Sequence, residues 1–335
     1  MLPLAISMGC PAGIGPEIIL KHFSNRRNQH TSGPAVVVGD IGVLSFYAEK
    51  LSFSISLLPW QPGEPADFKE GVIPVYESST LPESSITAGT FNRDTALAMA
   101  AAITSAVKGV QQGFFSGLCT CPISKEALQN SGQHFPGHTE MLAALTGSTR
   151  QVMMLAGDSL RVTLATIHCS IAQVPEKLGT AMLLELFRTT CKSLVTDFDI
   201  RTPRIAVAAL NPHAGEAGMF GTEEKTIIKP AIKAGLQEGL NLHGPFPPDT
   251  VFNKAVNGEY DAVICMYHDQ GLIPFKLLHF KDGVNVTLGL PIVRTSVDHG
   301  TAYDIAGKGI ADPRSLTAAI ELGLRIITNR SRHNV

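Results

Sequence analysis

The chain has no apolar run of about 18 residues, the length that a membrane-spanning helix needs. Its first residues, MLPLAISMGC, lack the basic segment of a secretory signal peptide, so we expect a cytoplasmic protein. An excess of either charge is also missing, because 27 Lys and Arg stand against 29 Asp and Glu, for a net charge of −2. That balance gives no electrostatic reason to expect nucleic acid or an anionic membrane as a partner.

Cysteine pairs with metal or redox spacing are missing as well. The six cysteines include no C-x-x-C pair and mostly lie in apolar runs, so we expect reduced, buried thiols. The sequence contains no internal repeat, low-complexity tract or block of like charge. With 335 residues it can bury a large core, and we expect two lobes built from discontinuous segments.

Short apolar runs alternate with amphipathic stretches, which is typical of βαβ units and of an α/β fold. Buried strands are predicted at residues 4–8, 35–39, 114–120, 204–210 and 261–267. Helices are predicted over Gly15–Asn25, Arg93–Gln111, Lys125–Ser131, Pro175–Asp197 and Glu223–Glu238. Residues 151–167 differ, because two apolar runs flank Gly157-Asp158-Ser159 and predict an antiparallel hairpin.

Three histidines, His168, His213 and His268, each follow a strand-like run. Open α/β sheets bind ligands outside the carboxyl ends of their strands, and neutral imidazole is the commonest metal ligand in proteins. Three histidines with one open position form a catalytic metal site, although this wide spacing matches no local metal motif. From position alone, three separate buried histidines are the stronger alternative.

A glycine-rich loop, residues 9–17 (GCPAGIGPE), joins the first predicted strand to the first predicted helix. It lacks the G-x-G-x-x-G spacing of a dinucleotide fingerprint and the lysine of a P-loop. Glu17, in the first helical turn, also disfavours an anion there. A tight turn is therefore a stronger interpretation than a ligand-binding loop.

Several polar residues are candidates for binding an anion. His138 and Thr139 open the helix MLAALTG, where free N–H groups attract phosphate or carboxylate, and a simple helix cap at Thr139 is the equal alternative. Lys276, Asn285 and Arg294 supply two cations and an amide, and the last two flank the strand-like run VTLGLPIV. Solvated surface charge is the alternative, more so for Lys276 than for Arg294.

Polar turns follow two of the predicted strands, NPHAGE at 211–216 and YHDQG at 267–271. Titratable residues at strand ends indicate function more often than those on helix faces. A long glycine-rich loop at 298–313 (DHGTAYDIAGKGIADP) carries acids that could accept ribose hydroxyls. An ordinary long loop is an equal interpretation of that segment.

A series of motifs strongly resembles the 4-hydroxythreonine-4-phosphate dehydrogenase (PdxA) family. In chain order they are GxPAGIGPE, GHTE, NPHAGE, FGTEE, MYHDQGL, GVNVTLGLPIVRTSVDHGTA and DIAGKGIADP. The last loop also looks like the adenosine-binding loop of isopropylmalate and isocitrate dehydrogenases, whose fold the family shares. The resemblance covers essentially the whole chain and implies an isocitrate/isopropylmalate dehydrogenase-like α/β fold, two α/β/α lobes with a cleft between them, forming one catalytic unit over 1–335.

The resemblance also implies roles for individual residues. A divalent metal is implied at His168, His213 and His268. A phosphorylated hydroxy-acid substrate is implied at His138, Thr139, Lys276, Asn285 and Arg294. NAD or NADP is implied at a loop that includes His299, Gly300, Asp304 and Asp312. A homodimer is implied, with the active site at the subunit interface and one partner lending part of the metal site.

The implied reaction is oxidation of a secondary alcohol β to a carboxylate, after which the β-keto acid loses CO₂. On 4-phosphohydroxy-L-threonine it yields 3-amino-2-oxopropyl phosphate, on the route to pyridoxal 5′-phosphate. An all-nitrogen ligand set favours Zn²⁺ over Mg²⁺, with Co²⁺ a further candidate. Asp249 or Asp269 could accept the alcohol proton, and Asp304 favours NAD over NADP because an acid at the ribose repels a 2′-phosphate.

One position departs from the family pattern, since Cys10 stands where the family usually has Asp. The change removes a charge and a strong hydrogen-bond acceptor, and the segment CPISKE at 121–126 departs as well. The nearest alternative is a paralogue acting on 4-phospho-D-threonate, 4-phospho-D-erythronate or an aromatic cis-dihydrodiol carboxylate. Alternatives of other classes are a phosphate acyltransferase, which would not need metal-binding histidines, and a non-catalytic metal-binding dimer.

Overall fold

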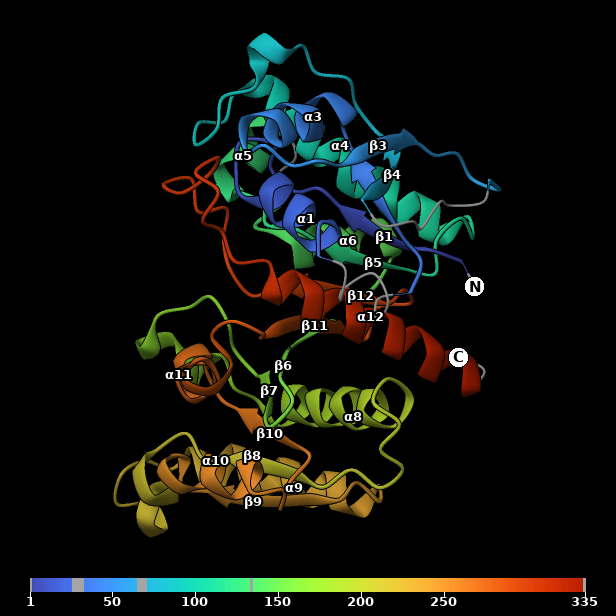
Figure 1. Cartoon of the computed structure of the whole chain (residues 1–335). Coiled ribbons are helices and arrows are strands. Elements are labelled where there is room, and N and C mark those ends of the chain that lie inside the picture. The colour runs from blue at the N-terminus through green and yellow to red at the C-terminus, as the bar shows by residue number, and fades with distance from the viewer. Residues whose placement is uncertain (1, 26–32, 65–70, 133–134, 334–335) are drawn as a thin grey trace. The chain divides into compact units, whose positions relative to one another are not determined.

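The computed structural model describes residues 2–25, 33–64, 71–132 and 135–333. Its alternating helices and strands (Figure 1) confirm the α/β class predicted from the sequence. The chain divides into two compact units, each made of two segments: unit 1 is residues 1–149 and 290–327, and unit 2 is residues 150–289 and 328–335. No helix in the described part of the chain combines the length and apolar character that crossing a membrane requires.

Unit 1 contains a parallel sheet in the order β3-β4-β2-β1-β5-β12. Its strands are β1 (Leu4–Ser7), β2 (Ala35–Gly39), β3 (Ser56–Pro59), β4 (Val72–Glu77), β5 (Gly117–Thr120) and β12 (Arg294–Val297). Its helices are α1 (Gly15–Phe23), α3 (Ile41–Lys50), α4 (Arg93–Gln111), α5 (Lys125–Asn130), α6 (His138–Thr146) and most of α12 (Arg314–Arg332). A short 3₁₀ turn, η1 (Glu83–Ser85), precedes α4.

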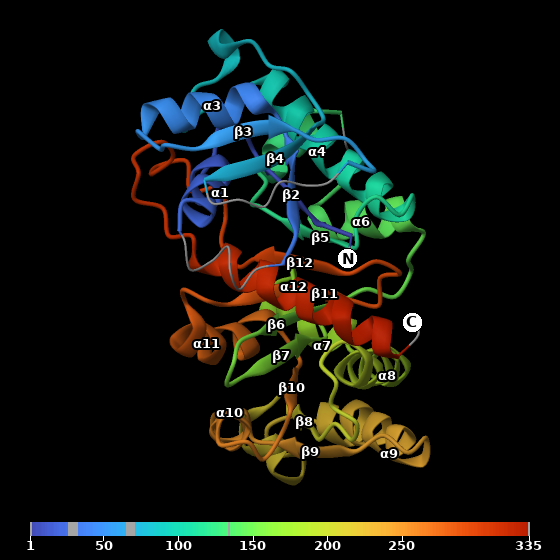
Figure 2. The same ribbon diagram turned by 45° about the vertical axis from the view of Figure 1, so that its right-hand side comes forward.

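The core of unit 1 forms where α4 packs against β1, β2 and β5 (Figure 2). Asn92 starts this helix with a capping box, accepting a hydrogen bond from the backbone N–H of Thr95 while the Thr95 hydroxyl accepts one from the backbone of Asn92. Its buried face, which includes Met99 and Ile103, packs against apolar strand residues. Because the central strands β1, β2 and β5 are parallel and buried, they lie in apolar runs, as the sequence predicted.

Unit 2 contains a mixed sheet in the order β11-β6-β7-β10-β8-β9. Its strands are β6 (Val152–Ala156), β7 (Arg161–Leu164), β8 (Ile205–Ala208), β9 (Leu242–Phe246), β10 (Ala262–Cys265) and β11 (Val284–Leu288). Its helices are α7 (Val174–Lys177), α8 (Thr180–Thr196), α9 (Lys229–Gln237), α10 (Pro248–Val256) and α11 (His268–His279). Its irregular turns are η2 (Ile171–Gln173), η3 (Pro212–Gly218) and η4 (Glu224–Ile228).

The predicted hairpin is confirmed, because β6 and β7 pair antiparallel around residues 157–160. From β7 onward the strands β7, β10, β8 and β9 are parallel neighbours. Helices α10 and α11 pack on β7, β8 and β10 through an apolar cluster that includes Val263, Leu272 and Phe275. This packing fixes the position of α11, whose first residue is His268.

The structure corrects several sequence-based boundaries. The predicted helix over Pro175–Asp197 is two helices, α7 and α8, separated by residues 178–179, and the predicted helix over Glu223–Glu238 begins as a π-helical turn. The run VTLGLPIV is not one strand, because Gly289 has a φ of +78° and ends β11 in a turn before β12 begins at Arg294. The alternative in which Thr139 caps its helix is wrong, since Gly137 is the N-cap of α6 and Thr139 lies inside the helix.

The turn that carries His213 has an unusual backbone. His213, Ala214, Glu216 and Ala217 all have positive φ angles, and each non-glycine residue in that region costs about 1–2 kcal/mol. A carboxylate from the following π-helical turn holds the segment. Glu224 is only 3% exposed and accepts hydrogen bonds from the backbone N–H groups of Leu210 and Asn211 at 2.9 and 2.8 Å and from the Asn211 side chain at 3.0 Å.

Two glycines allow this arrangement. A Cβ on Gly215 would lie 2.6 Å from a carboxylate oxygen of Glu224, and a Cβ on Gly221 would lie 2.4 Å from the side-chain nitrogen of Asn211. Burial raises the pKa of Glu224, but hydrogen bonds from the side chain and backbone of Asn211 outweigh burial, and the pKa lies below its ordinary value of 4.5. Glu224 is therefore a buried, ionised anchor for the turn.

We expect Glu224→Gln to destabilise the protein by about 1–3 kcal/mol at neutral pH, because the new amide nitrogen would face other hydrogen-bond donors. Urea unfolding measures the effect. Glu223→Gln is the matched control, because the half-buried Glu223 contacts only the Asn211 side chain in this cluster. Equal stability of Glu224→Gln and the wild type would contradict the anchoring role.

The same variant predicts a pH dependence. A carboxylate whose folded-state pKa is lowered contributes stability above its unfolded-state pKa and loses that contribution as the pH falls through the folded-state value. The stability difference between the wild type and Glu224→Gln should therefore be full at pH 7 and shrink as the pH falls below 4.5. A difference that stays constant down to about pH 3 would exclude linkage to this carboxylate.

Candidate active site

The three histidines singled out from the sequence all follow parallel strands of unit 2. His168 follows β7, His213 follows β8 and His268 follows β10, and β10 pairs in parallel with both β7 and β8. Because the carboxyl ends of neighbouring parallel strands lie at the same edge of a sheet, the three turns emerge at one edge. That edge is where open α/β sheets bind their ligands.

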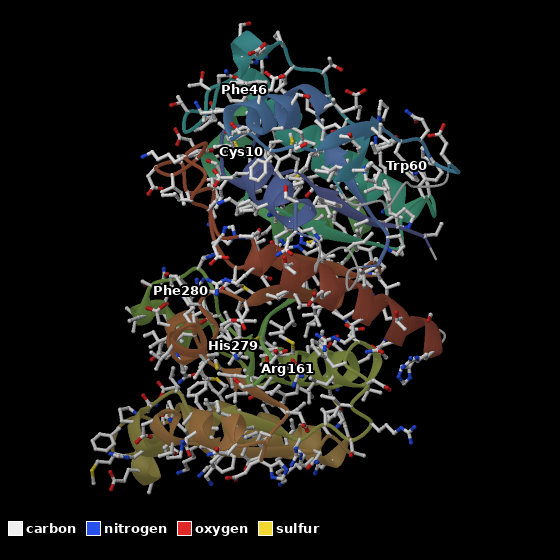
Figure 3. The ribbon with its side chains drawn as sticks, in the orientation of Figure 1. Cys10, Phe46, Trp60, Arg161, His279 and Phe280 are labelled. Atoms are coloured by element: carbon white, nitrogen blue, oxygen red, sulfur yellow. The ribbon has the colours of Figure 1, made fainter. Side chains whose placement is uncertain are left out.

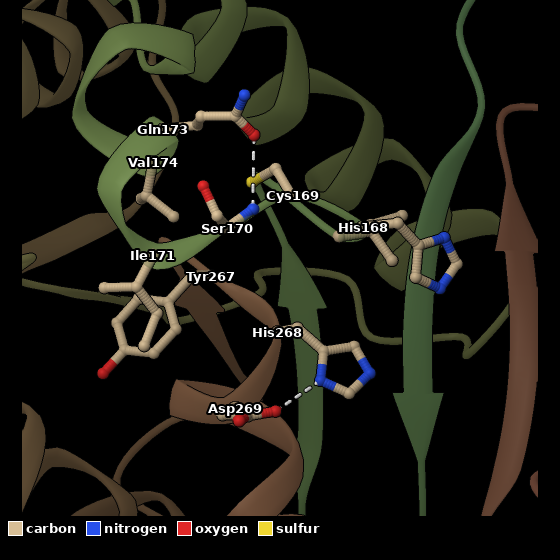
Figure 4. Close-up of a pocket in the computed structure, with 10 residues that line it drawn as sticks. His168, Cys169, Ser170, Ile171, Gln173, Val174, Tyr267, His268 and Asp269 are labelled. Atoms are coloured by element: carbon tan, nitrogen blue, oxygen red, sulfur yellow. Dashed lines mark hydrogen bonds and ion pairs between the residues drawn. The ribbon is translucent and has the colours of Figure 1, made fainter.

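A pocket of about 580 Å³ opens at this edge, and Figure 4 shows its lining. Its walls come from the segment after β7 and from the start of α11, and the lining residues are Ile167, His168, Cys169, Ser170, Ile171, Gln173, Val174, Tyr267, His268 and Asp269. The ring centroids of His168 and His268 lie 6.3 Å apart, with the ring planes tilted by 35°. Two imidazoles thus lie close together at the pocket.

An acid orients one of these imidazoles. The Nδ1 of His268 lies 2.6 Å from a carboxylate oxygen of Asp269, as the dashed line in Figure 4 shows. When Nδ1 carries the ring proton and donates a hydrogen bond to this carboxylate, the lone pair of the ring is on Nε2. A carboxylate behind a histidine in this way fixes the tautomer and raises the basicity of the coordinating nitrogen, as in many metal sites. The donor set therefore fits a divalent cation.

His213 packs against an aromatic side chain. Its ring packs 6.4 Å from that of Phe220, centroid to centroid. Among the residues that the structure describes, no group of three or more His, Cys, Asp or Glu side chains converges closely enough to hold a metal ion. A single chain thus brings two of the three histidine rings near each other, and the turn anchored by Glu224 presents the third at the same edge of the sheet.

Unit 1 supplies an electropositive position. Arg294, 3% exposed at the start of β12, donates a hydrogen bond of 2.8 Å to the hydroxyl of Thr120 at the end of β5. Burial lowers the pKa of Arg294 to about 10, so the guanidinium is still charged at neutral pH. Burial, followed by the charge of Arg294, holds the pKa of His138 well below its ordinary range, so this imidazole is neutral. A buried cation beside a neutral imidazole suits an anionic group of a ligand.

His138 has a feature that supports a ligand there. Its Nε2 is buried and has no hydrogen-bond partner among the described residues. His138 is the first residue of α6, where free backbone N–H groups favour an anion, and Thr139 is the second. The other two candidate anion contacts belong to unit 2: Lys276 is half-buried on α11, and Asn285 is half-buried in β11.

The acids proposed for catalysis lie on separate helices. Asp269 contacts His268, whereas Asp249 is exposed in the first turn of α10 and does not line the pocket. The carboxylate of Asp269 is thus committed to orienting an imidazole.

The glycine-rich loop expected to bind a nucleotide belongs to unit 1. Asp304 is exposed at its centre, whereas Asp312 forms a salt bridge with Arg314. His299 and Gly300 contact each other through the His299 Nδ1 and the Gly300 carbonyl, 3.1 Å apart. Of the two acids, Asp304 is therefore the better placed to accept hydrogen bonds from a ribose.

Two residues that matter here were missed in the sequence. Thr120 ends the apolar run FFSGLCT, and its place at the carboxyl end of a strand is a signal that a polar residue faces a ligand edge. Glu224 lies in the motif FGTEE, but nothing in the sequence pairs it with Leu210 and Asn211. That pairing depends on how the chain folds back after β8.

Comparisons with known proteins place the chain in a family. Residues 31–323 match the family model "Pyridoxal phosphate biosynthetic protein PdxA". The 4-hydroxythreonine-4-phosphate dehydrogenase of Desulfosudis oleivorans is 50% identical over 322 residues, covering 96% of this chain and 95% of that protein. The enzyme of the same name from Desulforapulum autotrophicum is 46% identical over 333 residues, covering 99% and 98%.

Solved structures show the same relationship. The crystal structure of 4-hydroxythreonine-4-phosphate dehydrogenase from Klebsiella pneumoniae has a TM-score of 0.90 and 39% identity, covering 97% of this chain and 98% of that one. The terephthalate 1,2-cis-dihydrodiol dehydrogenase of Burkholderia xenovorans is more distant, with a TM-score of 0.67 and 28% identity over 97% of this chain and 98% of that one.

Two further matches bear on the alternatives. A Bradyrhizobium diazoefficiens protein named as a D-threonate 4-phosphate dehydrogenase is 41% identical over 341 residues, covering 98% of this chain and 97% of that protein. The EutD phosphotransacetylase of Staphylococcus aureus, at 14% identity and a TM-score of 0.50 over 96% of this chain and 94% of that one, shares the fold alone. The family match and the full-length identities decide the assignment: the chain belongs to the PdxA family of pyridoxal phosphate biosynthetic proteins.

Proposed function

We propose that the protein is an NAD- or NADP-dependent 4-hydroxythreonine-4-phosphate dehydrogenase. It oxidises the secondary alcohol of 4-phosphohydroxy-L-threonine to 2-amino-3-oxo-4-phosphooxybutanoate, which loses CO₂ to give 3-amino-2-oxopropyl phosphate for pyridoxal 5′-phosphate synthesis. The observation that carries the proposal is the near-complete coverage at about half identity by enzymes of that name. We propose that residues 1–335 act as a single catalytic unit in the cytoplasm.

His168, His213 and His268 are the proposed ligands of a divalent metal, with Zn²⁺ favoured over Mg²⁺ or Co²⁺ because all three donors are nitrogens. Their support is the common strand edge and the Asp269 carboxylate behind His268. When bound, such a cation acts as a Lewis acid that lowers the pKa of the substrate alcohol and stabilises the enolate left by CO₂.

The proposed substrate-binding residues are His138, Thr139, Lys276, Asn285 and Arg294. The features that support an anionic ligand are the buried guanidinium of Arg294 and the Nε2 of His138, which has no hydrogen-bond partner among the residues that the structure describes. A phosphate so held fixes the reacting carbon relative to the cofactor, which contributes through positioning.

Asp249 or Asp269 would accept the alcohol proton: Asp269 lines the pocket but is engaged with His268, whereas Asp249 is exposed outside the pocket lining. The loop with His299, Gly300, Asp304 and Asp312 would bind the nicotinamide cofactor, which would serve as the hydride acceptor. The exposed Asp304 carboxylate favours NAD, because it accepts ribose hydroxyls and repels a 2′-phosphate.

We propose that the active form is a homodimer whose interface includes α11. Three apolar residues at helical spacing, Ile273 and Leu277 on this helix and Phe280 at its C-cap, are 68%, 85% and 77% exposed, and Figure 3 labels Phe280. An apolar stripe of this kind marks an interaction surface. The proposed partner is a second copy of the chain, because the helix that carries two of these residues begins with His268, and among the described residues of one copy no three potential metal ligands converge.

The substrate proposal predicts a preference that NAD reduction measures directly. With Zn²⁺ and NAD, kcat/KM for 4-phosphohydroxy-L-threonine should exceed that for 4-phospho-D-threonate and 4-phospho-D-erythronate by about tenfold or more. These acids share the alcohol and the phosphate but lack the amino group. The reverse preference would show that the protein is the sugar-acid paralogue. The name of the Bradyrhizobium relative, which refers to D-threonate 4-phosphate, supports that alternative.

The dimer proposal predicts that Leu277→Asp yields a monomer with little activity, because the charge would be buried in an apolar interface. Light scattering after gel filtration measures the mass, and calorimetric titration with Zn²⁺ measures metal affinity. Leu236→Asp is the matched control, since Leu236 is 52% exposed on α9, away from the stripe. A dimeric, fully active Leu277→Asp protein would place the interface elsewhere.

A further inference from the structure

The glycine-rich loop at 9–17 has no part in the chemistry proposed above. Its glycines lack nucleotide-binding spacing, and the side chain of Glu17 is fully buried at the start of α1. A buried carboxylate is costly unless its oxygens are hydrogen-bonded. The contacts of Glu17 and its neighbours show what the loop does.

Glu17 and Lys21 together bind four backbone groups of the loop at 298–313. The carboxylate of Glu17 accepts hydrogen bonds from the N–H groups of Ala311 at 2.8 Å and Gly309 at 3.3 Å. The ammonium of Lys21 donates to the carbonyl groups of the same residues at 2.6 and 2.8 Å. The two side chains also pair with each other at 3.1 Å, one helical turn apart. The N–H groups and the carbonyl groups of Gly309 and Ala311 are therefore all bonded to side chains of α1.

A second set of contacts holds the beginning of the same loop. The backbone N–H of Ile14 donates to the carbonyl of Thr301 at 3.0 Å. This close approach of the two segments favours glycine at position 13, because a Cβ on Gly13 would lie 3.0 Å from that carbonyl oxygen. The sulfur of Cys10 lies 3.3 Å from the hydroxyl of Tyr303, and Figure 3 labels Cys10.

A third segment completes the contacts. The N–H of Gly89 donates to the carbonyl of Ala12 at 2.8 Å, and a Cβ on Gly89 would lie 2.8 Å from the carbonyl oxygen of Tyr303. The ring of Tyr303 stacks on that of Phe91, with centroids 6.0 Å apart. The loop is thus contacted at 301, 303, 309 and 311, whereas Asp304 stays exposed between these points.

We propose that residues 9–21 form a cradle that preorganises the cofactor loop, with Glu17, Lys21 and Cys10 as positioning residues that do not touch the cofactor. The proposal rests on the proposed function, since it takes the loop at 298–313 as the site of the nucleotide. A loop ordered before binding costs less entropy when the ligand arrives, so loosening the cradle weakens cofactor binding without altering the chemical step.

The proposed cradle explains why an acid, Glu17, stands in the first turn of α1, although a helix N-terminus otherwise favours a bound anion. The N–H groups that need an acceptor belong to another loop, and a carboxylate at the helix N-terminus also interacts favourably with the helix dipole. Lys21 neutralises the buried charge. The glycines of the motif provide close backbone approach, not phosphate binding.

The test compares Lys21→Met with Lys108→Met in the full-length protein. Lys21→Met keeps the aliphatic part of the side chain and removes the ammonium group. Because the Lys21 side chain is 20% exposed, this variant should fold. Glu17→Gln is less suitable, because it would disturb a fully buried group. Lys108 is an exposed residue of α4 and serves as the matched control. Hydrogen–deuterium exchange and steady-state kinetics are measured on each protein.

We expect Lys21→Met to speed exchange in residues 299–312 and to raise KM for NAD by about tenfold, with kcat and the substrate KM within about twofold of the wild type. Cys10→Ala should raise KM for NAD less, because it removes one weak contact. Unchanged exchange in the loop, or a loss in kcat with an unchanged KM for NAD, would overturn the proposal.

The two proposals can fail separately. If the wild-type protein reduces NAD with none of the substrates, the proposed function fails, and loop exchange in Lys21→Met still decides whether the cradle exists. If the wild type is active and Lys21→Met behaves like Lys108→Met in both measurements, the cradle fails and the proposed function stands.

Discussion

The parallel pairing of β10 with β7 and β8 is the constraint on which the candidate site depends. It sends three chain segments out of the sheet at one edge, so side chains more than forty residues apart in sequence emerge as neighbours. The antiparallel hairpin of β6 and β7 sets the direction of β7, since a parallel crossover would need a helix there. Without that reversal, the segment with His168 would leave the opposite edge of the sheet.

Strand topology alone does not orient a side chain, and acids supply the rest. The buried Glu224 binds the N–H groups that precede His213, and the buried Glu17 binds the N–H groups of a separate loop. Both carboxylates satisfy backbone groups that regular secondary structure leaves unpaired, whereas the exposed Asp269 holds the ring of His268. Backbone shapes that would be unstable alone, such as the left-handed turn at His213, persist because these bonds hold them.

The sequence predicted the class of fold, the principal strands and the hairpin, because apolar runs and turn residues are local signals. It missed the break between α7 and α8 and the turn at Gly289, where the apolar pattern continues although the backbone changes direction. The positions of the candidate residues at strand ends were visible in the same way. The partners of Glu17 and Glu224 were not, since those bonds join segments whose proximity depends on the whole fold.

The departure at Cys10 bears on the nucleotide loop more directly than on the substrate. Its side chain is fully buried, and burial raises the pKa of the thiol, so a neutral group faces the Tyr303 hydroxyl. Because its side chain is fully buried, Cys10 has no exposed surface in this structure with which to contact a substrate amino group. An aspartate in its place would put a carboxylate against that hydroxyl, a stronger and costlier contact. On the proposal that residues 9–21 hold the loop at 298–313, the exchange of Asp for Cys changes how firmly that loop is held.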